Sequence, residues 1–190
     1  MRDEFLHRKE QILSKLDKSF KQSIDEKIQL LCNTLNSSEN YYTTSSCAGR
    51  ILIKELNISK QQNIFLFVSH NLINIEEINN SIREIKEEQF PIEIKQESAI
   101  IHVVSRDQKY ALELMQIAKQ AGFNQSGIIS IKEWGVVVEC ICDISLQLPM
   151  YNKQFIQNNQ EYLKQTLDSM NQNLESTWKS IDELEKLFIS

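Results

Sequence analysis

Apolar side chains recur every three or four residues in four stretches of the chain, the spacing of an amphipathic helix. The predicted helices cover about residues 4–16, 24–35, 75–86 and 109–121. Ser23 stands three residues before Glu26, which predicts a capping box at the start of the second helix. From about residue 153 the apolar positions follow heptad-like intervals to the C-terminus. This pattern favours one long helix packed along its own domain, with a dimerising coiled coil as the alternative.

Short apolar and β-branched runs between these helices predict strands. They fall at residues 41–45, 50–56, 63–68, 92–94, 99–104, 126–131 and 136–141. The last two are expected to form a hairpin around Trp134, and Pro149 is expected to end the sheet-rich part. Because strands and helices are interspersed without a repeat or a linker, we predict a single α+β domain over residues 1–190, with a mixed or antiparallel sheet, packed helices and a long C-terminal helix.

Composition and charge exclude several functional classes. The net charge of −5 argues against indiscriminate nucleic-acid binding, although a local basic patch for one particular RNA remains compatible with it. Basic side chains near the N-terminus, among them Arg8 and Lys9, are the candidates for such a patch. The four glycines form neither G-x-G-x-x-G nor a P-loop, so a Rossmann fold is not expected.

The chain has no apolar run as long as a membrane span and no signal-peptide pattern at Met1, so we expect a cytoplasmic protein with no membrane contact. Its four cysteines lack C-x-x-C spacing, which predicts reduced thiols and no metal site. Cys140 and Cys142 alternate on one strand face and are expected to be buried.

One polar run stands out between apolar flanks, Thr-Thr-Ser-Ser-Cys-Ala-Gly-Arg at residues 43–50. Hydroxyls, backbone amides and the fixed charge of Arg50 are what a polar or anionic ligand needs, and Gly49 lets backbone approach a ligand closely. The run therefore predicts a strand end, a ligand-binding turn and a second strand. A surface turn rich in serine and threonine is the alternative of equal weight.

Two histidines lie in apolar strands. His70 ends one predicted strand and His102 interrupts another, whereas His7 lies on a charged helix face and is expected to be solvated. A histidine in an apolar strand is more often a satisfied core group than a catalyst, but positions near strand ends often carry site residues. Cys47 could pair with either histidine as a nucleophile, yet no local signature supports that.

The polar run closely resembles the signature of the tRNA wybutosine-synthesising protein 3 family. Other stretches that resemble the family in order and spacing lie at residues 17–25, 67–70, 97–103, 111–128 and 146–171, so the likeness covers nearly the whole chain. Gln22 and Ser98 depart from the family pattern, where glycine and proline are usual. The first departure lies in a stretch that we expect to contact ligand.

The resemblance implies a methyltransferase that uses S-adenosyl-L-methionine and acts on the hypermodified guanosine beside the anticodon of tRNA-Phe. It implies the tRNA-Phe anticodon loop as partner, no metal, and a monomer as the favoured state. A non-catalytic RNA-binding or adaptor protein of tRNA modification is one alternative. A different small-molecule enzyme that uses Cys47 with His70 or His102 is another.

The resemblance also implies residue roles. The implied catalytic residues are Asp25, His70 and His102. The implied cofactor contacts are Ser45, Ser46, Gly49, Arg50 and Ser126. The implied substrate contacts are Ser19, Lys21 and Ser23.

Some of these roles stay open between two ligands. Arg50 is expected to bind a carboxylate, which both the cofactor and the aminocarboxypropyl side chain of the substrate carry. Asp25 could receive the cofactor's ammonium or act as base, and the two strand histidines are better base candidates because imidazole titrates near neutral pH. Cys47 is expected to be a small filler beside the sulfonium.

Overall fold

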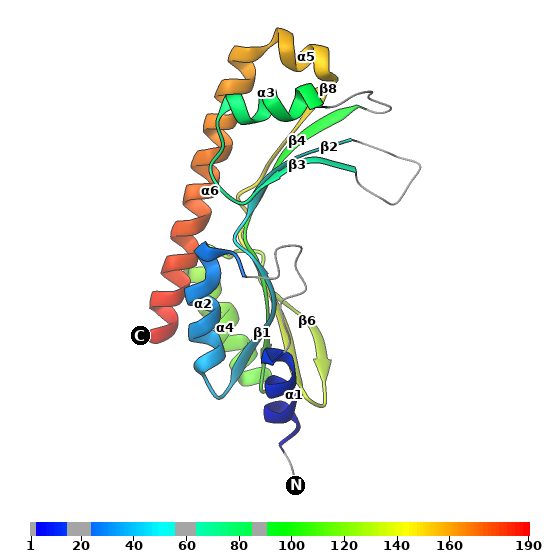
Figure 1. Ribbon diagram of the computed structural model, residues 1–190. Coiled ribbons are helices and arrows are strands. Elements are labelled where there is room, and N and C mark those ends of the chain that lie inside the picture. Colours follow the sequence, from blue (N-terminus) through cyan, green and yellow to red (C-terminus); the bar gives the residue numbers. More distant parts are fainter. Residues whose placement is uncertain (1–2, 15–23, 56–63, 85–90) are drawn as a thin grey trace. The chain divides into compact units, whose positions relative to one another are not determined.

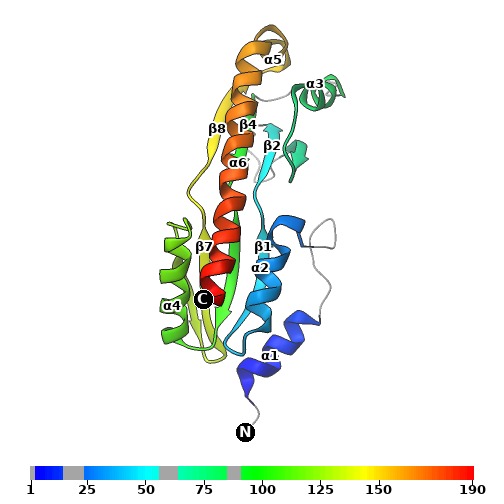
Figure 2. The same cartoon turned by 90° about the vertical axis from the view of Figure 1, so that its left-hand side faces the viewer.

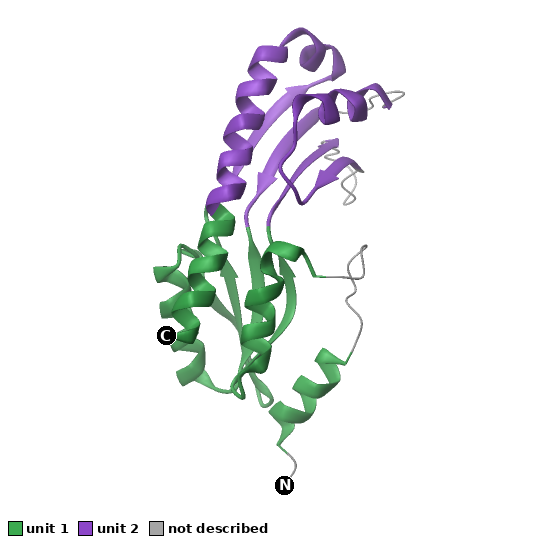
Figure 3. Cartoon of the chain, turned by 60° about the vertical axis from the view of Figure 1, so that its left-hand side comes forward, with its two compact units in different colours: residues 1–48, 99–143, 177–190 green, residues 49–98, 144–176 purple. Residues whose placement is uncertain are grey.

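The computed structural model describes residues 3–14, 24–55, 64–84 and 91–190. Within these ranges the chain forms six α-helices and eight strands, and every strand pair is antiparallel. The prediction of an α+β fold with a long C-terminal helix is confirmed. The chain forms two compact units, which Figure 3 colours separately. Both are built from discontinuous segments, and the single domain over residues 1–190 stays a prediction.

Unit 1 comprises Met1–Ala48, Ala99–Asp143 and Thr177–Ser190. Its sheet has the order β1-β5-β7-β6. These strands are β1 (Tyr41–Cys47), β5 (Ile100–Ser105), β7 (Gly135–Ile141) and β6 (Gly127–Lys132). The helices of the unit are α1 (Glu4–Leu13), α2 (Glu26–Ser37), α4 (Gln108–Gln120) and the end of α6 (Gln160–Ile189).

The two faces of the unit 1 sheet differ in their cover. Helices α2, α4 and α6 lie against one face (Figures 1 and 2), where Ile101, Val103 and Val138 are fully buried. On the other face, α1 packs Phe5 against Tyr42 and Val104 near one end of the strands. The remainder of that second face keeps partly exposed side chains, and it is called the open face of unit 1 below.

Unit 2 comprises Gly49–Ser98 and Ile144–Ser176. Its sheet has the order β3-β2-β4-β8. These strands are β3 (Ile64–Ser69), β2 (Arg50–Glu55), β4 (Ile92–Glu97) and β8 (Leu146–Tyr151), and the helices are α3 (Ile75–Glu84), α5 (Lys153–Asn158) and the first part of α6. Gln96, fully buried, donates to the Ile144 carbonyl and accepts from Asn173 on α6, so its amide is satisfied.

Three expectations from the sequence are wrong in detail. Pro149 lies inside β8, which the sequence did not predict, and an edge strand tolerates a proline because its missing N–H is not needed for pairing there. The long helix is interrupted at Asn159, between α5 and α6. Helix α2 begins at Glu26 with Asp25 as its N-cap, two residues later than predicted, and Ser23 of the predicted capping box lies outside the described residues. None of the described helices is long and apolar enough to cross a membrane.

Candidate active site

The polar run at residues 43–50 connects two sheets and is not a turn within one. Strand β1 continues to Cys47 and pairs with β5, whereas β2 begins at Arg50 and pairs with β3 and β4. The expected turn that gathers hydroxyls and a cation is therefore absent from this segment. The serines belong to unit 1, and Gly49 and Arg50 belong to unit 2.

Both backbone groups of Ala48, its N–H and its carbonyl, are hydrogen-bonded to side chains of unit 1. Its N–H donates to Asp25 Oδ2 at 3.0 Å, and its carbonyl accepts from Trp178 Nε1 at 3.1 Å. Although Asp25 occupies the N-cap position of α2, its carboxylate makes no cap hydrogen bond and binds Ala48 instead. Asp25 therefore has a structural task at the end of β1, beside the catalytic role that the sequence predicts.

Gly49 meets two independent steric limits. Its φ of +94° lies in the left-handed region that favours glycine. A Cβ atom there would lie 2.9 Å from the Glu97 carbonyl oxygen and 2.9 Å from Leu174 Cδ1. These limits explain the glycine without a ligand, and its cofactor contact stays a prediction.

A β-bulge in β1 decides which hydroxyl faces His102. Thr43 pairs with Val103, and the next partner of β5 is Ser45 opposite His102, so Thr44 is the extra residue. Ser45 Oγ and His102 Nδ1 lie 2.7 Å apart. The sequence-predicted cofactor contact Ser45 and the predicted base His102 are thus directly hydrogen-bonded.

The hydrogen-bonded pair of Ser45 and His102 extends to a third strand. Glu139 on β7 pairs with His102 in register, and its Oε2 lies 2.8 Å from His102 Nε2. The His102 and Glu139 side chains are 26% and 29% exposed, so solvent and ligand can reach the row. Ser45, His102 and Glu139 share the open face of unit 1 and are called the relay row below.

Ser46 is separated from this row by strand alternation. It pairs with Ile101, whose side chain is fully buried under the helices, so Ser46 faces the opposite side of the sheet from Ser45. The structure does not bring the two serine hydroxyls together, and the cofactor role of Ser46 stays a prediction.

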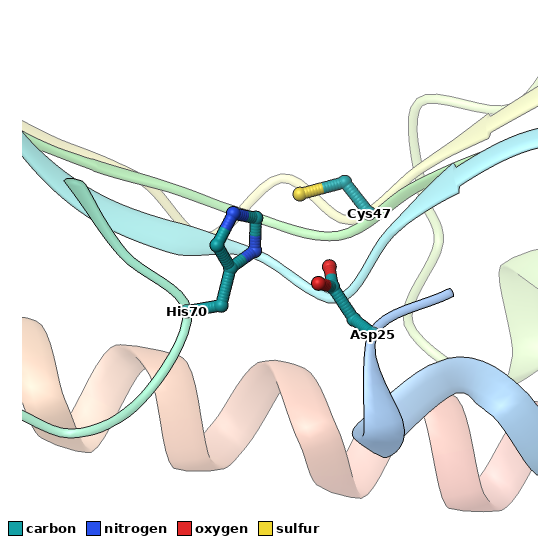
Figure 4. A group of neighbouring side chains, drawn as sticks. All are labelled: Asp25, Cys47 and His70. Carbon is teal, nitrogen blue, oxygen red and sulfur yellow. The ribbon is translucent and has the colours of Figure 1, made fainter. Parts of the chain in front are cut away.

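Cys47 lies in the neighbouring row of the open face, opposite Ile100. Figure 4 shows its side chain beside that of Asp25, and its sulfur lies within 4.8 Å of a carboxylate oxygen of Asp25. His102 Nδ1 is bonded to Ser45, and the rival role of Cys47 as a nucleophile with His102 stays a prediction. His70, also labelled in Figure 4, belongs to unit 2 and is described with that unit.

In unit 2, Arg50 belongs to a row of charges on β2 and β4. Its Nε donates to Glu97 Oε2 at 2.7 Å, and Lys95 Nζ lies 2.9 Å from Glu97 Oε1. The guanidinium also lies over the Phe65 ring, with 5.8 Å from Cζ to the ring centroid. No hydrogen bond of the two terminal Arg50 nitrogens joins it to another described residue. These three charged side chains are called the charge row below.

Glu97 is an ionised anchor for the two cations. Its partial burial alone would raise its pKa, but the hydrogen bonds and charges of Lys95 and Arg50 outweigh burial and hold the pKa below its usual value. The carboxylate is consequently charged at neutral pH and fixes the orientation of the Arg50 guanidinium, which is 33% exposed.

His70 follows β3 directly and is partly buried. The segment after it is shaped by polar bonds: the Ser69 hydroxyl donates to the Asn71 carbonyl, and Asn171 on α6 bonds both backbone groups of Ile73, at 3.0 and 2.7 Å. The histidine thus leaves the sheet on a fixed loop. Its role as a base stays a prediction.

The remaining predicted contacts lie elsewhere. The Ser126 hydroxyl donates to the Phe123 carbonyl at 2.6 Å and lies beside Cys140, where burial raises the pKa of the thiol to about 11. This bond gives Ser126 a structural role in its turn, and its cofactor contact stays a prediction. Ser19, Lys21 and Ser23 lie outside the described residues. The expectation that the chain holds no metal also stays a prediction.

Glu139 is the site residue that sequence reasoning missed. It interrupts the apolar strand Val-Val-Val-Glu-Cys-Ile. The two strand histidines were selected because each is a polar residue in an apolar strand, and the same criterion applies to Glu139. The alternation of side chains along a strand could have placed Glu139 on one face of the sheet. That Glu139 lies opposite His102 depends on the register between β5 and β7, which only the structure shows.

Comparison with known proteins gives a consistent result. The model of the family described as Methyltransferase TYW3 matches residues 7–190. The chain is 33% identical over 184 residues to the tRNA wybutosine-synthesizing protein 3 homolog of Homo sapiens, covering 94% of this chain and 70% of that protein. It is 31% identical over 195 residues to the tRNA(Phe) 7-((3-amino-3-carboxypropyl)-4-demethylwyosine(37)-N(4))-methyltransferase of Methanocaldococcus jannaschii, covering 96% and 99%. The PH1069 protein from Pyrococcus horikoshii has a similar solved structure, with a TM-score of 0.87, 26% identity, and coverage of 99% and 98%.

Proposed function

Because the chain belongs to the Methyltransferase TYW3 family and is therefore a methyltransferase, we propose that it methylates N4 of a demethylwyosine base in tRNA(Phe). The relatives from Methanocaldococcus jannaschii and Thermococcus sibiricus are named for that reaction at position 37. The proposed methyl donor is S-adenosyl-L-methionine. Membership of a methyltransferase family does not support the alternative of a non-catalytic adaptor.

The observation that carries the proposal is the 2.7 Å contact between Ser45 and His102. A ring nitrogen that gains a methyl group must lose its proton, either to a positioned base or to water. The relay row presents a hydroxyl backed by an imidazole on the open face of unit 1. In this proposal, Ser45 contacts the substrate and His102 takes up the proton, so Ser45 has a different role from the cofactor contact predicted from the sequence.

The chemistry of the predicted cofactor contacts fits S-adenosyl-L-methionine. The terminal nitrogens of Arg50 suit a carboxylate, which they would bind as a fork, and Glu97 holds the guanidinium in place from its other side. Asp25 offers a carboxylate of the charge that an ammonium group needs. When bound, the cofactor supplies a methyl group on a positively charged sulfur, which the neutral base can accept.

Described basic side chains near the N-terminus are engaged within unit 1. Arg8 stacks 3.8 Å from the centroid of the Trp134 ring, and Lys9 Nζ donates to the Ser38 carbonyl. Both fix α1 to its surroundings, so part of the basic patch expected from the sequence serves the fold. The proposed contacts with the anticodon loop therefore rest on Lys21 and its neighbours, outside the described residues.

A direct assay tests the proposed function. Phenylalanine tRNA from cells that lack this methylation is incubated with the purified protein and S-adenosyl-L-methionine, and the base at the modified position is analysed by mass spectrometry. We expect a gain of one methyl group on that base. A folded protein that adds no methyl, with the demethyl base confirmed in the tRNA, would contradict the proposal.

A matched pair of variants connects this activity to the relay row. His102→Gln should lose most of the activity, since a positioned base contributes about 10²-fold or more. His7→Gln, on α1, makes the same chemical change away from the row and should keep the wild-type rate. Equal methylation rates in the two variants would show that the activity does not depend on His102.

A further inference from the structure

Strand β7 carries one carboxylate among apolar side chains. Glu139 is only 29% exposed, and among the described residues His102 is its one hydrogen-bond and ion-pair partner. Its cross-strand partner on β6 is Gly127, and a Cβ atom added there would have no atom within 4 Å. The carboxylate is thus held against the imidazole on one side and has open space on the other.

We propose that Glu139 is a positioning residue for methyl transfer, which fixes the tautomer of His102. The inference rests on the proposed function of Ser45 and His102. An ionised carboxylate only accepts hydrogen bonds, so the 2.8 Å contact requires a proton on His102 Nε2. A neutral imidazole with its proton on Nε2 has a lone pair on Nδ1, the atom that faces Ser45.

This tautomer gives the relay row one direction for a proton. The Ser45 hydroxyl donates to His102 Nδ1, which leaves the oxygen lone pairs of Ser45 for an N–H of the substrate. As the methyl group moves to the substrate nitrogen, its bond to the donor sulfur would break and leave a neutral thioether. The substrate proton would pass to Ser45 Oγ while the hydroxyl proton of Ser45 passes to Nδ1. The product gains an N–C bond and loses an N–H bond, and the resulting imidazolium is balanced by the Glu139 carboxylate.

A purely structural ion pair is a weaker explanation for Glu139. Partly exposed pairs contribute little to stability, with a median of about 0 to 1 kcal/mol. Valine or isoleucine at this strand position would fit the neighbouring apolar residues of β7 without a charge to desolvate. The carboxylate is better explained by its effect on the protonation of His102.

Nuclear magnetic resonance of the histidine rings tests the tautomer without any assay of activity. The chain has three histidines, and the missing signals of His102→Gln would assign those of His102. In the wild-type protein at a pH where the ring is neutral, we expect the proton on Nε2. In Glu139→Ala, the two neutral tautomers should be mixed. A wild-type proton on Nδ1, or unchanged signals in the variant, would overturn the inference.

Kinetics test the consequence for the reaction. Glu139→Gln should lower kcat by about 10²-fold, at the lower end of what a positioned base contributes, and change KM less than about 2-fold. Glu139→Asp keeps the charge and should recover part of kcat. Glu133→Gln, in the exposed turn between β6 and β7, removes a charge away from His102 and should match the wild type. A rise in KM alone, or no recovery by Glu139→Asp, would overturn the inference.

The two experiments separate failure of this inference from failure of the proposed function. If the wild-type protein methylates no tRNA but its His102 ring responds to Glu139→Ala, then the positioning is present and the reaction is misassigned. If methylation proceeds and neither the ring nor kcat responds to Glu139, then the positioning role is wrong and the proposed function stands.

Discussion

The two units have sheets of the same size, but the polar side chains on the two sheets differ in their chemistry. Each contains a four-stranded antiparallel sheet and a set of three interacting polar side chains, which spans three strands in unit 1 and two strands in unit 2. In unit 1 the relay row joins a hydroxyl, an imidazole and a carboxylate, groups that exchange protons. In unit 2 the charge row joins two basic side chains to one carboxylate, and these groups form ion pairs.

This difference assigns separate tasks within the proposed reaction. Side chains that exchange protons can act in the chemical step, whereas Arg50 holds a permanent charge and can bind a charged part of a ligand. Substitutions in the relay row should therefore affect mainly kcat, and substitutions in the charge row should affect binding. The predictions below test that contrast, from the largest expected effect to the smallest.

Arg50→Ala should have the largest effect, a loss of methyl transfer by about 10³-fold, since two charged hydrogen bonds to a ligand carboxylate are removed. Glu97 keeps Lys95 as its partner, so we expect the fold to persist. Circular dichroism and the methylation assay measure the two effects.

Lys54→Ala is the matched control for Arg50. Lys54 also pairs with a glutamate of β4, at 3.1 Å from Glu93, and that glutamate retains a bond from Gln147. Because the change leaves the buried Glu93 carboxylate without its cation, we expect a loss of stability of about 3 kcal/mol or more, with near-normal methylation by the folded protein. Near-normal turnover by Arg50→Ala would contradict the prediction that Arg50 binds a ligand.

Ser45→Ala should lower kcat by about 10²-fold with little change in KM, because the proposed hydroxyl of the relay is lost. Ser130→Ala makes the same change on β6, where Ser130 pairs with Val137, and should keep wild-type kinetics. The contrast between the rows would fail if Ser45→Ala raised KM and left kcat unchanged.

Gly49→Ala should destabilise the protein by about 2 kcal/mol or more, since a left-handed φ and two close contacts oppose the added methyl. Gly127→Ala adds the same methyl where nothing lies within 4 Å and should change the free energy of unfolding by less than about 0.5 kcal/mol. Urea unfolding measures both. Similar values for the two variants would contradict the steric account of Gly49.

The charge row should also add acid sensitivity. The pKa of Glu97 is lower in the folded protein than in the unfolded chain, so its stabilising effect is present above the unfolded value of about 4.3 and is lost as pH falls through the folded pKa. Unfolding measured from pH 7 downward should show a smaller acid loss of stability for Glu97→Gln than for wild type. Parallel curves would show that Glu97 titrates alike in both states.

Cys47→Ala should have the smallest effect, retaining activity within about 3-fold, because small apolar replacements beside a ligand cost little when no bond is lost. The cysteine is partly buried and lies in the row next to Ser45. Complete loss of methylation with an unchanged fold would refute its role as a filler and reopen the nucleophile hypothesis.

The sequence predicted the periodic elements well and the irregular ones poorly. The amphipathic helices and the hairpin around Trp134 follow from residue spacing alone. Strand β8 was missed because Pro149 hid an edge strand, and the interruption at Asn159 leaves no clear mark on the apolar repeat. The bulge at Thr44 depends on pairing with β5 and cannot be read from β1.

The site was predicted in part for a similar reason. Residue chemistry selected Ser45 and His102, but only strand register shows that they touch and that Ser46 faces the other way. A strand switch between two sheets also looks like a tight turn in the sequence, since Ala48 and Gly49 are compatible with both. Local patterns report residue types, whereas long-range pairing decides which of them meet.

Single-turnover methylation of demethylwyosine-containing tRNA(Phe), with excess enzyme and saturating S-adenosyl-L-methionine, tests the central claim most directly. The account predicts that wild type and His7→Gln methylate the base at the same rate, and that His102→Gln is slower by about 10²-fold or more. A wild-type rate for His102→Gln would contradict the account, because the relay row would then take no part in removing the proton.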